Sequence, residues 1–416
     1  MRRAVLCLVL ILLSAGGIAR STTLEEDFPL EGTMRLGPLR LRPFILIKDT
    51  GYDDNVFLED TRRVSDFTST VEPGAKLLTL FADRAALLVE ERLDYVWFAQ
   101  TISQNHFNNN TRAQANFYLK RITLFGEVNL LSYRERPSTE IDFRIRRHEN
   151  FFGAGIKYER PRSSLEARLG EDDYRYDSGT PQGEGIPDAL NRTETRLTLT
   201  GREKVLPKTT FLLEWEGRTI GFDEPAGQAK DSTARRVSGG FEFDPTAFLR
   251  GSVKVGVESL RPDEENQRGF RGMVGEGTLL YRITGVTNLE GRGRRNTGFT
   301  VASGNVYFVD TSYGTTLTQY LAERVAAEVG ADRERVDYPE VTTLCDLNAG
   351  SCASGSPGLK TGFRTDEMRS YFVGASYRFS NQTRVGLRVG IWERDSTFDF
   401  LNRRRTTAQV TYTYNF

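Results

Sequence analysis

Apolar and polar side chains alternate along most of the chain from Leu39 onward. In 85–98, for example, one face carries apolar residues and the other carries charged ones, namely Leu87, Val89, Leu93, Tyr95 and Trp97 against Glu90, Arg92 and Asp94. Successive side chains of a β-strand point to opposite faces, so this period of two predicts strands. No stretch after the N-terminal region keeps a helical three-four spacing. The pattern therefore predicts an all-β chain.

The connections between these segments are alternately short and long. Lys120-Arg121 and Leu206-Pro207-Lys208 are short, whereas 177–190 and 339–362 are long. A barrel in an outer membrane has short turns on its periplasmic rim and longer loops on its outer rim. A soluble β-sandwich would show the same alternation within strands but has no reason to sort its connections. We therefore predict a transmembrane antiparallel up-and-down β-barrel of about 18 strands, spanning 39–416.

The N-terminal region has the three parts of a secretory signal. A basic start, Met1-Arg2-Arg3, precedes the apolar run 4–13 and the small residues Gly17-Ile18-Ala19. This predicts a signal peptide at 1–19 and a short periplasmic segment at 20–38. Together with the barrel pattern, it predicts the outer membrane of a Gram-negative bacterium as the location and its lipid as a partner.

The last segment, 405–416, has one apolar and aromatic face and one polar face. Tyr412, Tyr414 and Phe416 belong to the apolar face, and the chain stops on Phe416. This resembles the C-terminal signature by which outer-membrane barrels are recognised for assembly. The resemblance implies the barrel-assembly machinery as a partner.

The polar faces predict what lines the lumen. They carry both signs of charge, with arginine the commonest, and the candidates are Arg92, Arg112, Arg168, Arg196, Arg218, Arg292, Arg294, Arg378, Arg384 and Arg388. One interpretation is a set of paired charges that holds the wall rigid. The other is an arginine-rich path for an anionic solute, because rings of Arg or Lys favour anions. The interleaved glutamates favour the first.

Composition and cysteine spacing narrow the chemistry. The formal net charge is zero, which gives no indication of nucleic acid as a partner. Cys345 and Cys352 flank a loop containing a glycine, which in an oxidising compartment favours a disulfide. A metal site is the alternative, but no His lies nearby and thiolate zinc sites usually need four ligands.

Catalytic motifs are weak. His106 and His148, the only two histidines, are expected near outer loop ends, and neither has a nucleophile at an obvious spacing. Asp53-Asp54-Asn55 offers oxygen ligands that hard cations prefer, but an Asx-rich turn is the favoured interpretation. We expect no catalytic site, no cofactor and no metal.

The first part of the barrel resembles a known family. Arg42-Pro43-Phe44, then 51–57 with its Tyr-Asp-Asp-Asn segment, then Ser65-Asp66-Phe67 and Glu72-Pro73-Gly74 look like the opening of the putative beta-barrel porin 2 family. Members are commonly met with exopolysaccharide synthesis and export systems. The resemblance implies a barrel through which a polysaccharide leaves the cell, fed by a periplasmic export component. The strand number is also similar to that of the alginate export porin, from whose arginine-rich lumen this chain departs by its interleaved Glu.

Three functions follow as hypotheses. The first is an outer-membrane channel for an exopolysaccharide, and the second is a general porin for small hydrophilic solutes. A general porin would carry a long loop folding into the lumen, for which 339–362 is the candidate. The third is a barrel enzyme of the outer leaflet, which would need His106 or His148 to meet a carboxylate or hydroxyl at the rim.

Overall fold

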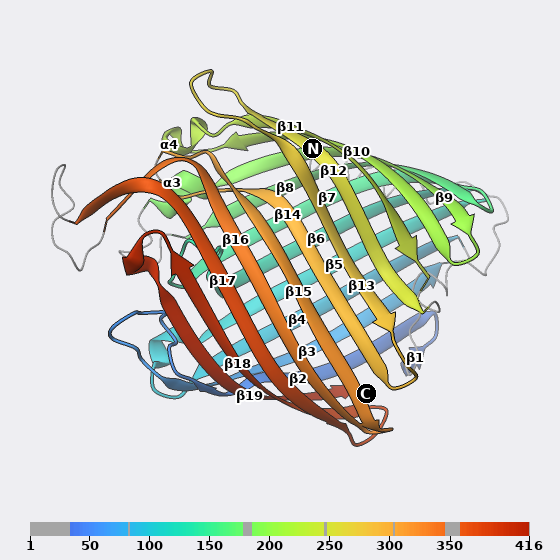
Figure 1. Ribbon diagram of the computed structural model, residues 1–416. Coiled ribbons are helices and arrows are strands. Elements are labelled where there is room, and N and C mark those ends of the chain that lie inside the picture. The colour runs from blue at the N-terminus through green and yellow to red at the C-terminus, as the bar shows by residue number, and fades with distance from the viewer. Residues whose placement is uncertain are drawn as a thin grey trace.

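The computed structural model is an antiparallel barrel wound from almost the whole chain (Figure 1). The structure describes residues 34–81, 84–177, 185–244, 248–302, 304–345 and 358–415. Each barrel strand pairs with its sequence neighbours, and β19 closes the circle against β2, with Ala408 opposite Tyr52. The strands β2 to β19 thus form a closed 18-stranded barrel, as the alternation predicted.

The described strands run almost end to end along the chain. They are β1 (Met34–Leu36), β2 (Leu39–Asp53), β3 (Asp66–Phe81), β4 (Ala85–Phe98), β5 (His106–Leu119), β6 (Ile122–Glu135), β7 (Ile145–Glu159), β8 (Ser163–Tyr176), β9 (Arg192–Leu206), β10 (Thr209–Phe222), β11 (Ser232–Phe243), β12 (Leu249–Pro262), β13 (Phe270–Arg282), β14 (Thr287–Phe299), β15 (Tyr307–Ala322), β16 (Val325–Cys345), β17 (Leu359–Arg378), β18 (Thr383–Ser396) and β19 (Arg403–Asn415).

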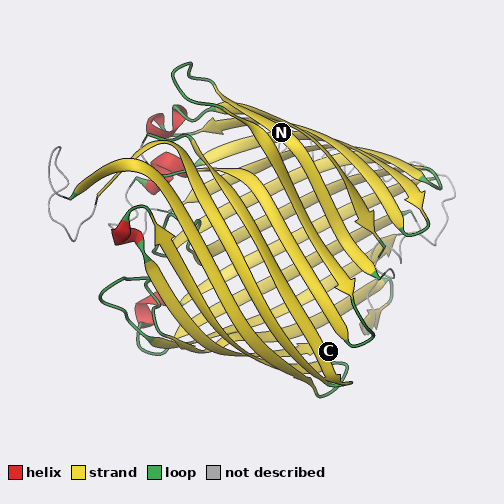
Figure 2. Cartoon of the chain, viewed as in Figure 1, coloured by secondary structure: helices red, strands yellow, loops and turns green. Residues whose placement is uncertain are grey.

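The helices of the described residues lie at one rim (Figure 2). They are the 3₁₀ turns η2 (Ile102–Gln104) and η4 (Asp399–Leu401) and the short helices α3 (Ile186–Leu190) and α4 (Pro225–Gln228). α3 lies in 177–190, which the sequence predicted to be a long connection, and the other three lie at the same rim. We call this the loop rim and the opposite one the turn rim. In the described part of the chain, no helix is long and apolar enough to cross a membrane.

The outer wall is apolar because every second residue faces away from the lumen. Leu93, Trp97, Leu197, Val257 and Val373 are among the many large apolar side chains left exposed. Such a surface would be a liability in water but suits lipid. Near the loop rim the aromatic pairs Phe67–Trp97 and Tyr95–Phe107 lie on this face, where interfacial aromatic girdles occur in such barrels.

The limits predicted for the connection 339–362 were wrong. β16 continues to Cys345 and β17 begins at Leu359, with these two residues paired. The described ends of these two strands extend beyond the loop rim (Figure 1), and 346–357 lie outside the described residues. The β-branched run Val341-Thr342-Thr343 favours this extension, and Pro339 is accommodated where the register shifts between Asp337 and Val341.

One wall pairing ends early. β13 and β14 pair only as far as Gly275 opposite Arg295, whereas β14 and β15 pair on to Phe299 opposite Tyr307. The end of β14 leaves the wall here and turns inward, so that Phe299 packs on Phe222 of β10. The Arg295 guanidinium donates to the Met273 carbonyl at 3.2 Å, which satisfies a backbone acceptor that the missing pairing would leave open.

Candidate functional site

The lumenal faces of the strands carry the charges. Along β4, Glu90, Arg92 and Asp94 alternate with the exposed apolar residues of the outer wall. Arg92 donates to Glu90 on its own strand at 2.7 Å and to Glu72 of β3 at 3.3 Å. The period of two therefore separates a lipid face from a charged lumen, as the sequence indicated.

The ten candidate arginines all lie at lumenal positions of their strands. Seven of them form ion pairs with carboxylates, namely Arg92, Arg168, Arg196, Arg218, Arg292, Arg294 and Arg388. The other three, Arg112, Arg378 and Arg384, have no ion pair within the described residues. For most of the lumen, the arrangement is that of paired charges and not of a free arginine path.

Some of these pairs join several strands. Glu258 of β12 is 1% exposed and accepts hydrogen bonds from Arg218 of β10 at 3.2 Å and from Arg236 of β11 at 2.8 Å. Thr297 of β14 donates to the same carboxylate at 2.5 Å. The Glu258 carboxylate thus links its own strand to β10, β11 and β14. It braces the wall where β14 turns inward.

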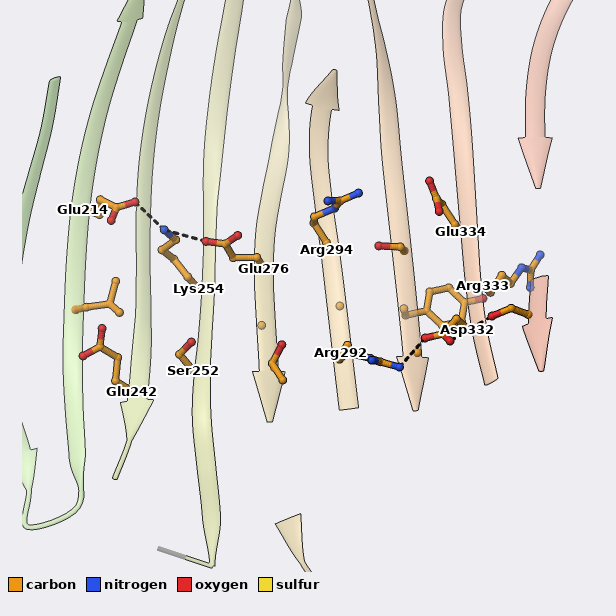
Figure 3. Close-up of a pocket in the computed structure, with 18 of the residues that line it drawn as sticks. Glu214, Glu242, Ser252, Lys254, Glu276, Arg292, Arg294, Asp332, Arg333 and Glu334 are labelled. Atoms are coloured by element: carbon orange, nitrogen blue, oxygen red, sulfur yellow. Dashed lines mark hydrogen bonds and ion pairs between the residues drawn. The ribbon is translucent and has the colours of Figure 1, made fainter. Parts of the chain in front are cut away.

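A lumenal cavity of about 680 Å³ is lined by side chains of β9 to β17 (Figure 3). On one side Lys254 bridges Glu214 at 2.8 Å and Glu276 at 3.1 Å. On the other side Arg292 contacts Asp332 at 3.0 Å. Charged groups of both signs therefore face the cavity, and they offer hydrogen-bond donors and acceptors to a hydroxyl-rich solute.

The loop between β6 and β7, residues 136–144, crosses the lumen near the loop rim. We call it the mouth loop. Its Glu140 accepts hydrogen bonds from the Thr300 hydroxyl and, at 3.3 Å, from the Val301 amide of the β14–β15 connection. Arg364 of β17 lies 4.0 Å from the same carboxylate. These strands are far from β6 and β7 around the wall, so the loop spans the mouth.

Asp142 anchors the mouth loop to a third part of the wall. Its carboxylate accepts from Arg394 of β18 at 2.9 Å and from Arg403 of β19 at 3.0 Å. Arg394 also donates to the Thr139 carbonyl at 2.6 Å and is 1% exposed. A guanidinium so fully desolvated needs these acceptors, since an unpaired buried charge costs several kcal/mol.

The two ends of the mouth loop are fixed as well. Arg136 and Arg144 both donate to the Val56 carbonyl of the β2–β3 loop, at 2.7 and 3.0 Å. Arg136 also donates to the Asp142 carbonyl at 2.6 Å. Burial lowers the pKa of Arg136 to about 9 and that of Arg144 to about 10. Such desolvation is typical of a packed layer and not of a mobile surface loop.

An apolar layer backs these polar anchors. Ile141 of the mouth loop packs with Ile145, Tyr176 and the α3 residues Ile186 and Leu190. Lys230 donates to the Thr300 carbonyl at 2.7 Å. Below the layer, a second cavity of about 630 Å³ shares Arg294 and Glu334 with the first. The lumen thus continues up to the mouth loop, whose residues 136–139, 141 and 142 line the second cavity.

Sequence reasoning missed this site. It gave the connection between β6 and β7 no role. The one available signal was composition, because two arginines, two carboxylates and an isoleucine share nine residues. Nothing in the sequence gives the partners of these charges, such as Arg394, which lies 252 residues from Asp142.

Comparison with known proteins agrees with this architecture. The family model described as "Putative beta-barrel porin 2" matches residues 33–416. The chain belongs to the putative beta-barrel porin 2 family. It is thereby an outer-membrane β-barrel of a porin family. No curated protein matches the chain.

Solved structures similar to this porin 2 barrel are also outer-membrane proteins. OpdK from Pseudomonas aeruginosa is 10% identical with a TM-score of 0.49, over 90% of this chain and 99% of that one. The siderophore receptor PirA from the same organism is 8% identical with a TM-score of 0.44, over 92% and 81% of the chains. A bacterial polysaccharide outer membrane secretin is 8% identical with a TM-score of 0.36, over 90% and 98%.

The Tyr-Asp-Asp-Asn segment of this porin 2 chain bonds the first barrel strand, β2, to the last, β19. Asp53 is fully buried and accepts from Arg405 of β19 at 3.0 and 2.6 Å. Asp54 accepts from the Thr406 amide at 2.6 Å. Asp53 also accepts from the Asn55 amide at 3.0 Å, so the predicted Asx turn is confirmed. Among the described residues, no cluster of three or more His, Cys, Asp or Glu is placed to hold a metal ion.

The remaining predicted residues fall in different places. His106 begins β5, with its ring at 2.6 Å from the Gln104 carbonyl, and His148 lies on β7 opposite Ser132. The structure does not bring the two histidines together. Cys345 ends β16, while Cys352 lies outside the described residues, so their pairing stays a prediction.

The C-terminal residues lie on the wall. Tyr412 and Tyr414 face outward opposite Ile47 and Ile45 of β2. Phe416 lies outside the described residues. Recognition of this segment during assembly stays a prediction.

Proposed function

We propose that this porin 2 barrel is an outer-membrane channel for an exopolysaccharide, kept closed at its outer mouth by the mouth loop. The observation that carries the proposal is the mouth loop itself. It crosses the lumen and is fixed by buried contacts of Glu140 and Asp142 to β14–β15, β18 and β19. A barrel with such a covered mouth conducts only when these contacts break.

The lining supports a saccharide as cargo. The lumen presents alternating guanidinium, ammonium and carboxylate groups, as in the Glu214–Lys254–Glu276 chain. Sugar hydroxyls both donate and accept hydrogen bonds, so they can replace one another along such a surface as a polymer slides. The resemblance of the Tyr-Asp-Asp-Asn region to a family met with export systems points to an exopolysaccharide and to a periplasmic component at the turn rim.

A general porin for small hydrophilic solutes is the second candidate. A loop that folds into the lumen is the feature expected of such a porin, and 136–144 provides it. The two candidates differ in whether the closed mouth is a permanent constriction or a gate.

Single-channel conductance of the refolded full chain separates them. The comparison is between the natural chain and a variant in which 137–143 is replaced by a short Gly-Ser connection. Low conductance that rises in the variant, with block by an acidic polysaccharide, is expected for the export channel. A steady conductance that neither the replacement nor the polysaccharide changes would favour the general porin. No conductance from either form would contradict both.

A further inference from the structure

The turn rim carries arginines that break the pairing rule of the lumen. Arg378 of β17 and Arg384 of β18 lie directly opposite each other. Both occupy lumenal positions, because their neighbours Tyr377 and Val385 face the outer wall. Directly opposed residues have Cα atoms about 4.5 to 5.5 Å apart. Two like charges at this separation destabilise the sheet unless something else neutralises them.

No carboxylate of the described residues pairs with either arginine. The Arg378 guanidinium donates instead to the backbone carbonyl of Glu323 at 2.8 Å. Glu328, the nearest lumenal acid along β16, is engaged with Arg388 at 3.2 Å. The contrast with the seven paired lumenal arginines makes this position an exception that needs a physical reason.

A third arginine joins the pair. Arg324 lies in the β15–β16 turn, and its carbonyl accepts from the Arg378 amide at 2.8 Å. We call Arg324, Arg378 and Arg384 the rim arginines. All three are exposed. An anion can therefore reach them without breaking an existing ion pair.

The connections of the two rims differ in charge, and the turn rim is the more basic of the two. The short turns carry more basic than acidic residues, for example at Lys120-Arg121 and in 160–162, whereas the loops of the opposite rim carry an acidic excess, for example in 263–269. An anion approaching the turn rim meets a positive potential, and one approaching the loop rim meets a negative one. The turn rim faces the periplasm in a barrel of this kind.

We propose that the rim arginines bind the carboxylate groups of an acidic saccharide at the periplasmic mouth. Guanidinium groups hold carboxylates with two parallel hydrogen bonds and stay charged at all physiological pH values. The lumenal position of Arg378 and Arg384 places the site in the path of a cargo and away from lipid headgroups. The inference rests on the proposed function, of which it names the charged class of cargo.

Binding of trigalacturonate to the detergent-solubilised full chain tests the site. The test variant is Arg378→Gln with Arg384→Gln. The matched control is Arg404→Gln, which removes an arginine paired with Glu393 at 3.3 Å on the outer wall. Loss of two exposed ion pairs is expected to weaken binding by about tenfold. The control is expected to bind as the natural chain does, and maltotriose is expected not to bind at this site.

The outcome is independent of conduction. Equal trigalacturonate affinity in the test variant and the natural chain would overturn the site, as would equal binding of maltotriose. A variant that binds weakly in a barrel that never conducts would leave the site standing and remove the export proposal. The electrophoretic mobilities of heated and unheated samples are compared first, because they differ when the barrel is folded. This confirms that each variant is folded before binding is measured.

Discussion

Replacing Asp142 by Asn should open the mouth. The carboxylate accepts hydrogen bonds from Arg394 at 2.9 Å and Arg403 at 3.0 Å, and these guanidinium groups are only 1% and 13% exposed. The amide removes the negative charge and leaves two nearly buried cations facing each other. The wall strands stay paired, so the effect falls on the mouth loop and not on the barrel.

The size of the effect follows from the burial of the partners. Hydrogen bonds to charged groups contribute about 1.5 to 3 kcal/mol each, and breaking a buried pair costs about 3 to 5 kcal/mol. Asp142 itself is 21% exposed, and Arg394 keeps the Thr139 carbonyl as an acceptor, which reduces the loss. We expect the closed mouth to lose about 3 kcal/mol, which lowers the ratio of closed to open states about 150-fold.

Single-channel recording in a planar bilayer measures this ratio as open probability. The matched control is Asp395→Asn, which removes a carboxylate that is 61% exposed and lies 3.4 Å from Arg369 on the outer wall. The control should behave as the natural chain does. If Asp142→Asn and Asp395→Asn show the same open probability, the anchoring role assigned to Asp142 is wrong.

Three further predictions concern other contacts. Burial raises the pKa of the Glu140 carboxyl above its ordinary value of 4.5. Protonation of Glu140 therefore stabilises the closed mouth. This contribution is complete below pH 4.5 and is lost as the pH rises through the raised pKa. Open probability should therefore increase with pH in the natural chain, and a Glu140→Gln channel that kept this dependence would contradict the assignment. Asp53→Asn should cost the β2–β19 seam about 3 kcal/mol and lower the urea midpoint of unfolding, whereas an unchanged midpoint would show that Arg405 does not depend on it. Reduction should change the gel mobility of the natural chain but not of a Cys345→Ser variant, and mass analysis of non-reduced peptides shows whether Cys345 and Cys352 are joined.

The barrel was predictable because its signal is local. Alternation along β4 or β17 and the sorting of connections each depend on neighbouring residues, and together they determine strands, lumen and rims. The ends of the strands were less predictable from the sequence. At 339–362 a proline and a cysteine pair suggested a loop, but the β-branched residues 341–343 continue the hairpin with Phe363 opposite Val341.

The mouth loop was not predictable because its partners are distant. Asp142 meets Arg394 across more than half the chain, and no periodic pattern links them. The sequence indicated that most lumenal arginines are paired, because glutamates are interleaved with them. Which arginines stay unpaired depends on the register of β17 against β18, and that places Arg378 opposite Arg384.

The most direct test of the account is release of a fluorescent acidic oligosaccharide from vesicles that contain the full chain. The natural chain and the variant with 137–143 replaced by Gly-Ser are compared at equal protein content, and empty vesicles give the background. The account predicts slow release through the natural chain and fast release through the variant. Release at the background rate from both would contradict the claim that this barrel is a saccharide channel covered by its mouth loop.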